Sequence, residues 1–186
     1  MAKTPSAMLP LGTLAPSFSL IDVVSEKQIN LDKHAGKVAT VIFFICNHCP
    51  YVKHIVDELP KLAHQYMPKG IQFIAINAND VTQYPDDSPE NMKKLAMEYD
   101  FPFVYLFDET QEVAMAYQAK CTPDFFVFNN KLELVYRGQL DDARLGNTVE
   151  VTGESIRVAL DALINNKAVP EDQKPSLGCS IKWKVV

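Results

Sequence analysis

Cys46-Asn47-His48-Cys49 has the residue types and the spacing for thiol–disulfide chemistry. The motif lies between the apolar run 38–45, which predicts a strand buried on both faces, and a long helical pattern. Free N–H groups and the positive dipole at a helix start stabilise a thiolate and lower a cysteine pKa from about 8.5. We therefore expect both sulfurs on the first helical turn, within bonding reach of each other. Cys46 is expected to be the more exposed thiol and the better nucleophile.

Other uses of a cysteine pair compete with redox chemistry. A structural zinc site would need two further ligands at a recognisable spacing, and Cys121 and Cys179 are solitary. Haem attachment needs a histidine directly after the second cysteine, where this chain has Pro50. Two inert buried cysteines are a third alternative. The position of the pair between a strand and a helix favours the redox interpretation, and we predict neither a metal nor a cofactor.

The rest of the chain alternates between short apolar runs and helical patterns, which is typical of an α/β domain. Pro60 interrupts the helical stripe that begins at Val52, so a kink or break is expected there. Ser88-Pro89-Glu90 predicts a capped helix start. Strands are expected at 38–45, 71–76, 103–107, 124–128 and 132–136, helices at 52–66, from 88, at 109–117 and from 152, and an irregular tail from 170.

Two segments resemble the redoxin branch of the thioredoxin-like superfamily, which holds the alkyl hydroperoxide reductase/thiol-specific antioxidant proteins. Residues 12–20, Gly-Thr-Leu-Ala-Pro-Ser-Phe-Ser-Leu, resemble its G-x-x-A-P-x-F-x-L segment, and Thr122-Pro123 resembles its Thr-cis-Pro loop. The resemblance implies a thioredoxin-like fold: a central mixed sheet flanked by helices, with a redoxin-type N-terminal extension and a strand–helix insertion. We expect an extension at 1–11, a redoxin domain at 12–166 and a C-terminal tail at 167–186.

The resemblance also implies roles for residues around the motif. Pro123 would be cis and would present the Thr122 backbone beside the sulfurs, as a short edge for an extended thiol substrate. His48 precedes the second cysteine and would stabilise the Cys46 thiolate. Cys121, two residues before Pro123, is an additional redox candidate, and Cys179 is a second one if the tail folds back over the site. Both alternatively pack as small hydrophobes.

The predicted function is that of an enzyme, a thiol–disulfide oxidoreductase in which Cys46 attacks a substrate disulfide and Cys49 resolves the mixed disulfide. Its partners would be a protein or small-molecule thiol or disulfide substrate and a thiol reductant. One alternative is a peroxiredoxin-like thiol peroxidase, although Ile42 and Cys46 replace the Pro and Thr of the peroxide-reacting motif. Another is a copper-handling metallochaperone that uses Cys46, Cys49 and a histidine. Ile45 replaces the Trp of thioredoxins, which argues against general protein-disulfide reduction.

Composition excludes several other classes of function. Eighteen Lys plus Arg against 23 Asp plus Glu give a net charge of −5, which disfavours nucleic acid and anionic membranes as partners. No apolar run approaches the roughly 18 residues that cross a bilayer. The first ten residues lack a secretory pattern, so a cytoplasmic location is expected.

Overall fold

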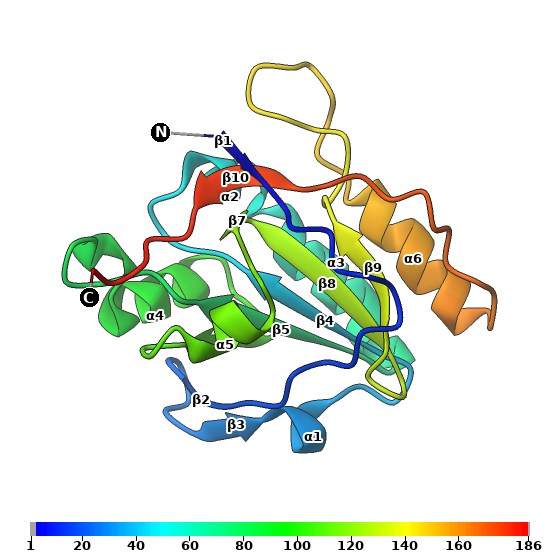
Figure 1. Ribbon diagram of the computed structural model, residues 1–186, viewed down its shortest axis with the longest axis horizontal. Coiled ribbons are helices and arrows are strands. Elements are labelled where there is room, and N and C mark those ends of the chain that lie inside the picture. Colours follow the sequence, from blue (N-terminus) through cyan, green and yellow to red (C-terminus); the bar gives the residue numbers. More distant parts are fainter. Residues whose placement is uncertain (1–2, 186) are drawn as a thin grey trace.

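The computed structural model describes residues 3–185, and within them a mixed sheet has the order β3-β2-β6-β5-β4-β8-β9 (Figure 1). The central strands β4, β5 and β6 run parallel, whereas β8 pairs antiparallel with β4 and β9 with β8. This arrangement confirms the predicted fold class, a central mixed sheet flanked by helices. The strands are β2 (Ser19–Asp22), β3 (Gln28–Asn30), β4 (Ala39–Phe44), β5 (Ile71–Asn77), β6 (Val104–Phe107), β8 (Asp124–Asn129) and β9 (Leu134–Gly138).

Helices cover both faces of this sheet. Val41 and Phe43 of β4 join one buried cluster with residues of α2, α3, α4 and α6, while Ile42 and Phe44 join a second cluster with α1 and α5. Because β4 is buried on both faces, its sequence shows no polar alternation. The helices are α1 (Leu31–His34), α2 (Pro50–Ile55), α3 (Glu58–Tyr66), α4 (Pro89–Glu98), α5 (Glu112–Ala116) and α6 (Glu154–Ile164), with 3-10 turns η1 (Met67–Lys69) and η2 (Pro85–Asp87). None of the helices in residues 3–185 is long and apolar enough to cross a membrane.

The helical stripe after the cysteine motif is divided into α2 and α3, as Pro60 predicts. The interruption lies at Val56 and Asp57, and Pro60 sits in the first turn of α3. A proline ring clashes with the carbonyl four residues earlier, which here belongs to Val56. The break therefore falls one turn before the proline.

A second, smaller sheet joins the two ends of the chain beside the cysteines. Strands β1 (Lys3–Pro5), β10 (Leu177–Ser180) and β7 (Cys121–Thr122) pair antiparallel in the order β1-β10-β7. Figure 1 shows red β10 lying between blue β1 and green β7. The expectation of an irregular tail from residue 170 is therefore wrong for 177–180. A short strand that contains glycine carries little sequence signal, and its pairing partners are remote in the chain.

Candidate active site

The cysteine pair lies in the connection between β4 and α2. Helix α2 begins at Pro50 with Cys49 as its N-cap, so Cys46 lies before the helix and not on its first turn as predicted. Both cysteines are fully buried, at 0% exposure, which corrects the expectation that Cys46 is the more exposed. The backbone N–H groups of Asn47 and His48 bond to the Asp87 carboxylate, and these bonds hold the motif outside the helix.

The loop at Pro123 faces both sulfurs. The Thr122–Pro123 peptide bond is cis, as expected. The Thr122 hydroxyl lies 3.3 Å from Cys46 Sγ, and the Thr122 carbonyl oxygen lies 3.2 Å from Cys49 Sγ. Thr122 thus contacts each member of the pair. Its backbone edge is paired with Cys179 of β10, so it is not the open edge for a substrate that the sequence led us to expect.

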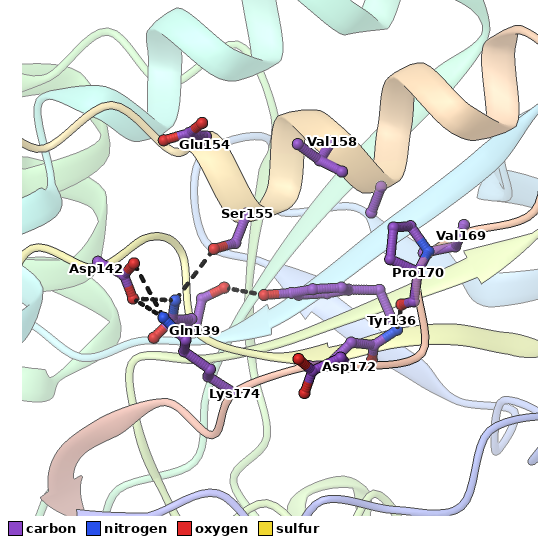
Figure 2. A pocket seen from close by; sticks show the side chains of 12 residues that line it. Tyr136, Gln139, Asp142, Glu154, Ser155, Val158, Val169, Pro170, Asp172 and Lys174 are labelled. Carbon is purple, nitrogen blue, oxygen red and sulfur yellow. Dashed lines mark hydrogen bonds and ion pairs between the residues drawn. The ribbon is translucent and has the colours of Figure 1, made fainter.

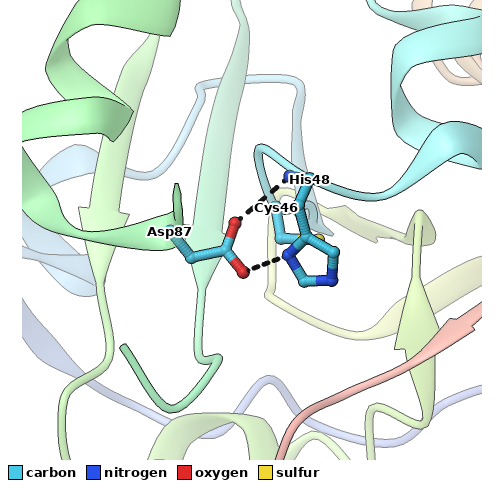
Figure 3. A group of neighbouring side chains, drawn as sticks. All are labelled: Cys46, His48 and Asp87. Atoms are coloured by element: carbon cyan, nitrogen blue, oxygen red, sulfur yellow. Dashed lines mark hydrogen bonds and ion pairs between the residues drawn. The ribbon is translucent and has the colours of Figure 1, made fainter. Parts of the chain in front are cut away.

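His48 and Asp87 are hydrogen-bonded to each other beside Cys46 (Figure 3). His48 Nδ1 and Asp87 Oδ2 are 2.6 Å apart, and a ligand atom from each of Cys46, His48 and Asp87 lies within 4.8 Å of the others. Asp87 is fully buried, and the His48 ring stacks on Tyr84 with centroids 5.2 Å apart. A buried carboxylate that bonds one ring nitrogen fixes the orientation of the imidazole. His48 is therefore positioned as a proton donor or acceptor close to Cys46.

Asp87 is the site residue that the sequence analysis missed. It is the last residue of η2 and immediately precedes Ser88, which caps α4 by accepting the Asn91 N–H. The Asn79 side chain, beyond the end of β5, donates to Asp87 Oδ2 at 2.8 Å. Helix α4 starts at Ser88-Pro89-Glu90, and this start fixes the position of Asp87, which lies opposite the end of β4. The helix-start pattern at 88–90 and the polar residues at the carboxyl end of β5 are the sequence signals that indicate Asp87 as a site residue.

The two motif cysteines have opposite pKa shifts. The pKa of Cys49 is lowered to about 5, first by the hydrogen bond from the Cys46 thiol and then by bonds from Cys179 and the Val52 N–H of α2. The pKa of Cys46 is raised, because its proton is engaged with Cys49, because it is buried and because Asp87 repels a negative charge. The lowered pKa places the negative charge of the reduced pair on Cys49, whereas the expected start of the helix at the motif predicts a thiolate on Cys46.

The two remaining cysteines differ in what their sulfurs contact. Cys179 Sγ lies 3.0 Å from Cys49 Sγ. Cys121 is on β7, and its thiol donates to the Pro123 carbonyl oxygen at 3.6 Å. Both are buried. Cys179 therefore contacts the motif, whereas Cys121 is hydrogen-bonded within the loop that contains Pro123.

Cys46 lines a groove of about 440 Å³ between α2 and α4. The groove contains both signs of charge, and neither Cys49 nor Cys179 is among its lining residues. Of the two motif cysteines, Cys46 alone borders this groove, although it is buried at 0% exposure. The lining residues are Cys46, Asn47, His48, Val52, Lys53, Val56, Asp86, Asn91, Lys94, Leu95, Glu98 and Tyr99.

A separate pocket of about 290 Å³ lies between α6, the end of β9 and the segment 169–174 (Figure 2). Its polar groups are bonded to one another. The Tyr136 hydroxyl donates to the Gln139 carbonyl oxygen, the Gln139 amide donates to Asp142 and Ser155, and Lys174 pairs with Asp142. No cysteine lines this pocket, and its bonds tie the tail to the domain.

Comparisons with known proteins agree with this fold. The chain aligns over its whole length with an uncharacterized conserved protein from Geobacillus kaustophilus, with 60% identity, a TM-score of 0.99 and 98% of that chain covered. A hypothetical protein from Sinorhizobium meliloti 1021 shares 41% identity over 98% of this chain and 100% of its own, with a TM-score of 0.96. The thioredoxin domain of a thiol-disulfide oxidoreductase from Bacteroides vulgatus shares the fold at 17% identity and a TM-score of 0.62, over 80% of this chain and 96% of that one. The Redoxin family model matches residues 10–154, and the chain belongs to the redoxin family.

Proposed function

We propose that this protein is a thiol–disulfide oxidoreductase whose redox centre is the Cys46–Cys49 pair. One observation carries the proposal: the side chain and the backbone of Thr122 contact the two sulfurs, one each, and of these two cysteines only Cys46 borders a groove. Thiols placed together in this way can exchange with a disulfide and then with each other.

The first step belongs to Cys46, because it is the motif cysteine that borders the groove. Cys46 gives up its proton to His48 beside it, and Cys49 stays a thiolate. Its sulfur then attacks one sulfur of a substrate disulfide in the groove, and the other substrate sulfur leaves as a thiolate. The product is a mixed disulfide on Cys46. His48, held by Asp87, is placed to protonate the departing thiolate.

Cys49 carries out the second step. As a thiolate it attacks the Cys46 sulfur, the Cys46–Cys49 bond forms and the second substrate thiol is released. Its position as N-cap of α2 and its bond from the Val52 N–H stabilise the negative charge before the attack. An external thiol reductant then restores the two thiols. We propose a small-molecule or protein disulfide as the substrate class.

Turnover of a disulfide by variants of the pair tests the proposal. With dithiothreitol as reductant and oxidised glutathione as substrate, the wild type is expected to accelerate reduction, and Cys46→Ser and Cys49→Ser to fall to the rate of dithiothreitol alone. Cys121→Ala is the control and is expected to retain the wild-type rate, because the Cys121 hydrogen bond goes to the Pro123 carbonyl. Unchanged turnover in either serine variant would contradict the proposal.

The lowered pKa of Cys49 at a helix N-cap also fits a thiol peroxidase. In that function Cys49 would attack a peroxide and become a sulfenic acid, and a neighbouring cysteine would resolve it. Arg137, Arg144 and Arg157 bond elsewhere, to the segments around Gln173, Gln139 and Glu58, and not to a cysteine among the described residues. Hydrogen peroxide consumption separates the two functions, and a Cys46→Ser variant that still consumes peroxide would favour the peroxidase.

Metal handling is the third function to be tested. Cys46, His48 and Asp87 offer ligand atoms within 4.8 Å of one another, and Cys49 is hydrogen-bonded to Cys46. The imidazole and the carboxylate already bond to each other, so a metal would have to replace that bond. Titration of the reduced protein with Cu(I) against a competing chelator gives the affinity, and tight binding lost in Cys46→Ser would favour this role.

A further inference from the structure

Strand β10 brings a third sulfur into the redox centre. Its register pairs Cys179 with Thr122, the residue that contacts both motif cysteines, and Cys179 Sγ lies 3.0 Å from Cys49 Sγ. Helix α2 also packs against β10. Cys49 therefore has a thiol neighbour on each side, Cys46 toward the groove and Cys179 toward β10.

Contacts with β1 and with the loop around Pro123 fix the position of Cys179. On its far side β10 pairs with β1, with Lys3 opposite Cys179. The backbone of Gly178 approaches the Thr122 carbonyl so closely that a Cβ atom would overlap it. The Ser176 hydroxyl donates to the Pro123 carbonyl at 2.6 Å, and the Ile181 N–H donates to the Lys120 carbonyl at 3.1 Å. These contacts fix the chain on either side of the cysteine, so the proximity of the two sulfurs is built into the fold.

We propose that Cys179 is a second resolving thiol, which accepts the disulfide from the Cys46–Cys49 pair. This inference rests on the proposed function. The Cys179 sulfur loses its proton and attacks Cys49 Sγ of the Cys46–Cys49 disulfide. The Cys46–Cys49 bond breaks, a Cys49–Cys179 bond forms, and Cys46 leaves as a thiolate that takes up the proton. One disulfide replaces another, so the only oxidant required is the substrate disulfide that made the first bond.

The exchange has two consequences. It returns Cys46 to the groove as a thiol while the protein is still oxidised, and it ties β10 covalently to the N-cap of α2. A Cys49–Cys179 bond requires the two sulfurs to approach from contact to about 2.05 Å. Cys121 is the matched comparison, because it too lies in the smaller sheet but bonds to a carbonyl rather than to a cysteine.

Disulfide mapping tests the proposal directly. Reduced wild type, Cys179→Ser, Cys179→Ala and Cys121→Ala are oxidised with one equivalent of oxidised glutathione under argon, alkylated in acid and digested with trypsin. Cleavage after Lys37 and Lys53 leaves Cys46 and Cys49 on one peptide, and Cys179 lies on another that ends at Lys182. A Cys46–Cys49 bond is then internal to one peptide, whereas a Cys49–Cys179 bond joins two.

We expect the joined peptide, with Cys46 alkylated, in oxidised wild type and in Cys121→Ala. Both Cys179 variants should give only the internal bond. Cys46→Ala, which cannot make the first bond, should give neither the internal bond nor the joined peptide. Absence of the joined peptide from oxidised wild type overturns the inference, whatever the variants show.

The same digest distinguishes this inference from the proposed function. An internal Cys46–Cys49 bond with normal turnover and no joined peptide leaves the proposed function standing and removes the role of Cys179. No internal bond at any time and no turnover would remove the proposed function instead.

Discussion

At the scale of single residues, the His48–Asp87 pair distinguishes this site from a bare pair of cysteines. Asp87 is buried and accepts bonds from the His48 ring, from two backbone N–H groups and from Asn79. Asp87 acts on Cys46 indirectly, because it fixes the orientation of the His48 imidazole, and it is therefore a positioning residue. The imidazole itself lies beside the sulfur that gains and loses the substrate.

Replacing the imidazole should slow proton transfer to and from Cys46. We expect His48→Gln to lower kcat for disulfide reduction on the order of 100-fold, with KM little changed, because general acid–base catalysis contributes on that scale. Asp87→Asn should lower kcat in the same direction and alter the pH profile. His64→Gln, on the exposed face of α3, is the control. An unchanged pH profile in Asp87→Asn would show that its role is structural only.

The single thiolate of the reduced pair should be visible by its absorbance near 240 nm. Because the pKa of Cys49 is lowered to about 5, the signal of one thiolate should be present at pH 7 and disappear as the pH falls through about 5. Cys49→Ser should lose this transition. Cys121→Ala should keep it. A midpoint near 8.5, the value of an ordinary cysteine, would contradict the assignment of the charge.

At the scale of elements, the close contact of β10 with β7 depends on Gly178. An added Cβ would overlap the Thr122 carbonyl, so Gly178→Ala should displace β10 from the site. We expect Cys179 in this variant to be alkylated at least tenfold faster than in wild type, because β10 can then open locally without unfolding of the whole protein. Ser180→Ala, on the same strand, removes only a contact with the Thr4 hydroxyl and is the control. Equal labelling of Cys179 in Gly178→Ala and wild type would contradict this account of the strand.

The start of α4 fixes Asp87 through the adjacent Ser88. Its hydroxyl accepts the Asn91 N–H at 3.4 Å, a long bond for an N-cap. Ser88→Ala should therefore cost about 0.5–1 kcal/mol of stability, the lower part of the usual range, measured by urea unfolding. Ser88→Asp, which preserves the cap, should restore it. A loss above about 2 kcal/mol would mean that Ser88 does more than cap the helix.

Local patterns in the sequence predicted most of these elements. The β-branched run of β4, the capped start of α4 and the proline break between α2 and α3 are each encoded within a few residues. Asp87 and Cys179 reach the cysteines only through tertiary contacts, because η2 and β10 are brought there by segments remote in the sequence. The true start of α2 was missed because bonds from Asp87, which no local pattern reveals, hold Asn47 and His48 out of the helix.

At the scale of the whole molecule, Asp124 makes stability depend on pH. Burial raises its pKa to about 7 in the folded protein, from 3.8. The folded state therefore binds a proton that the unfolded state releases between about pH 4 and 7, and the free energy of unfolding should fall as pH rises across that range. Asp124→Asn removes this titration, so its stability should lack that downward slope. Parallel pH profiles for the variant and the wild type, from urea unfolding at fixed salt, would contradict the assignment.

The central claim is that Cys46 attacks the substrate and Cys49 resolves the intermediate. Trapping by mass spectrometry tests it most directly, because a variant that lacks only the resolving thiol accumulates the mixed disulfide. Reduced Cys49→Ser and Cys46→Ser are each treated with oxidised glutathione, and the adduct is located by peptide mapping. We predict a glutathione adduct on Cys46 in Cys49→Ser and none on Cys49 in Cys46→Ser. An adduct on Cys49 in Cys46→Ser, with Cys46 left unmodified in Cys49→Ser, would contradict the account.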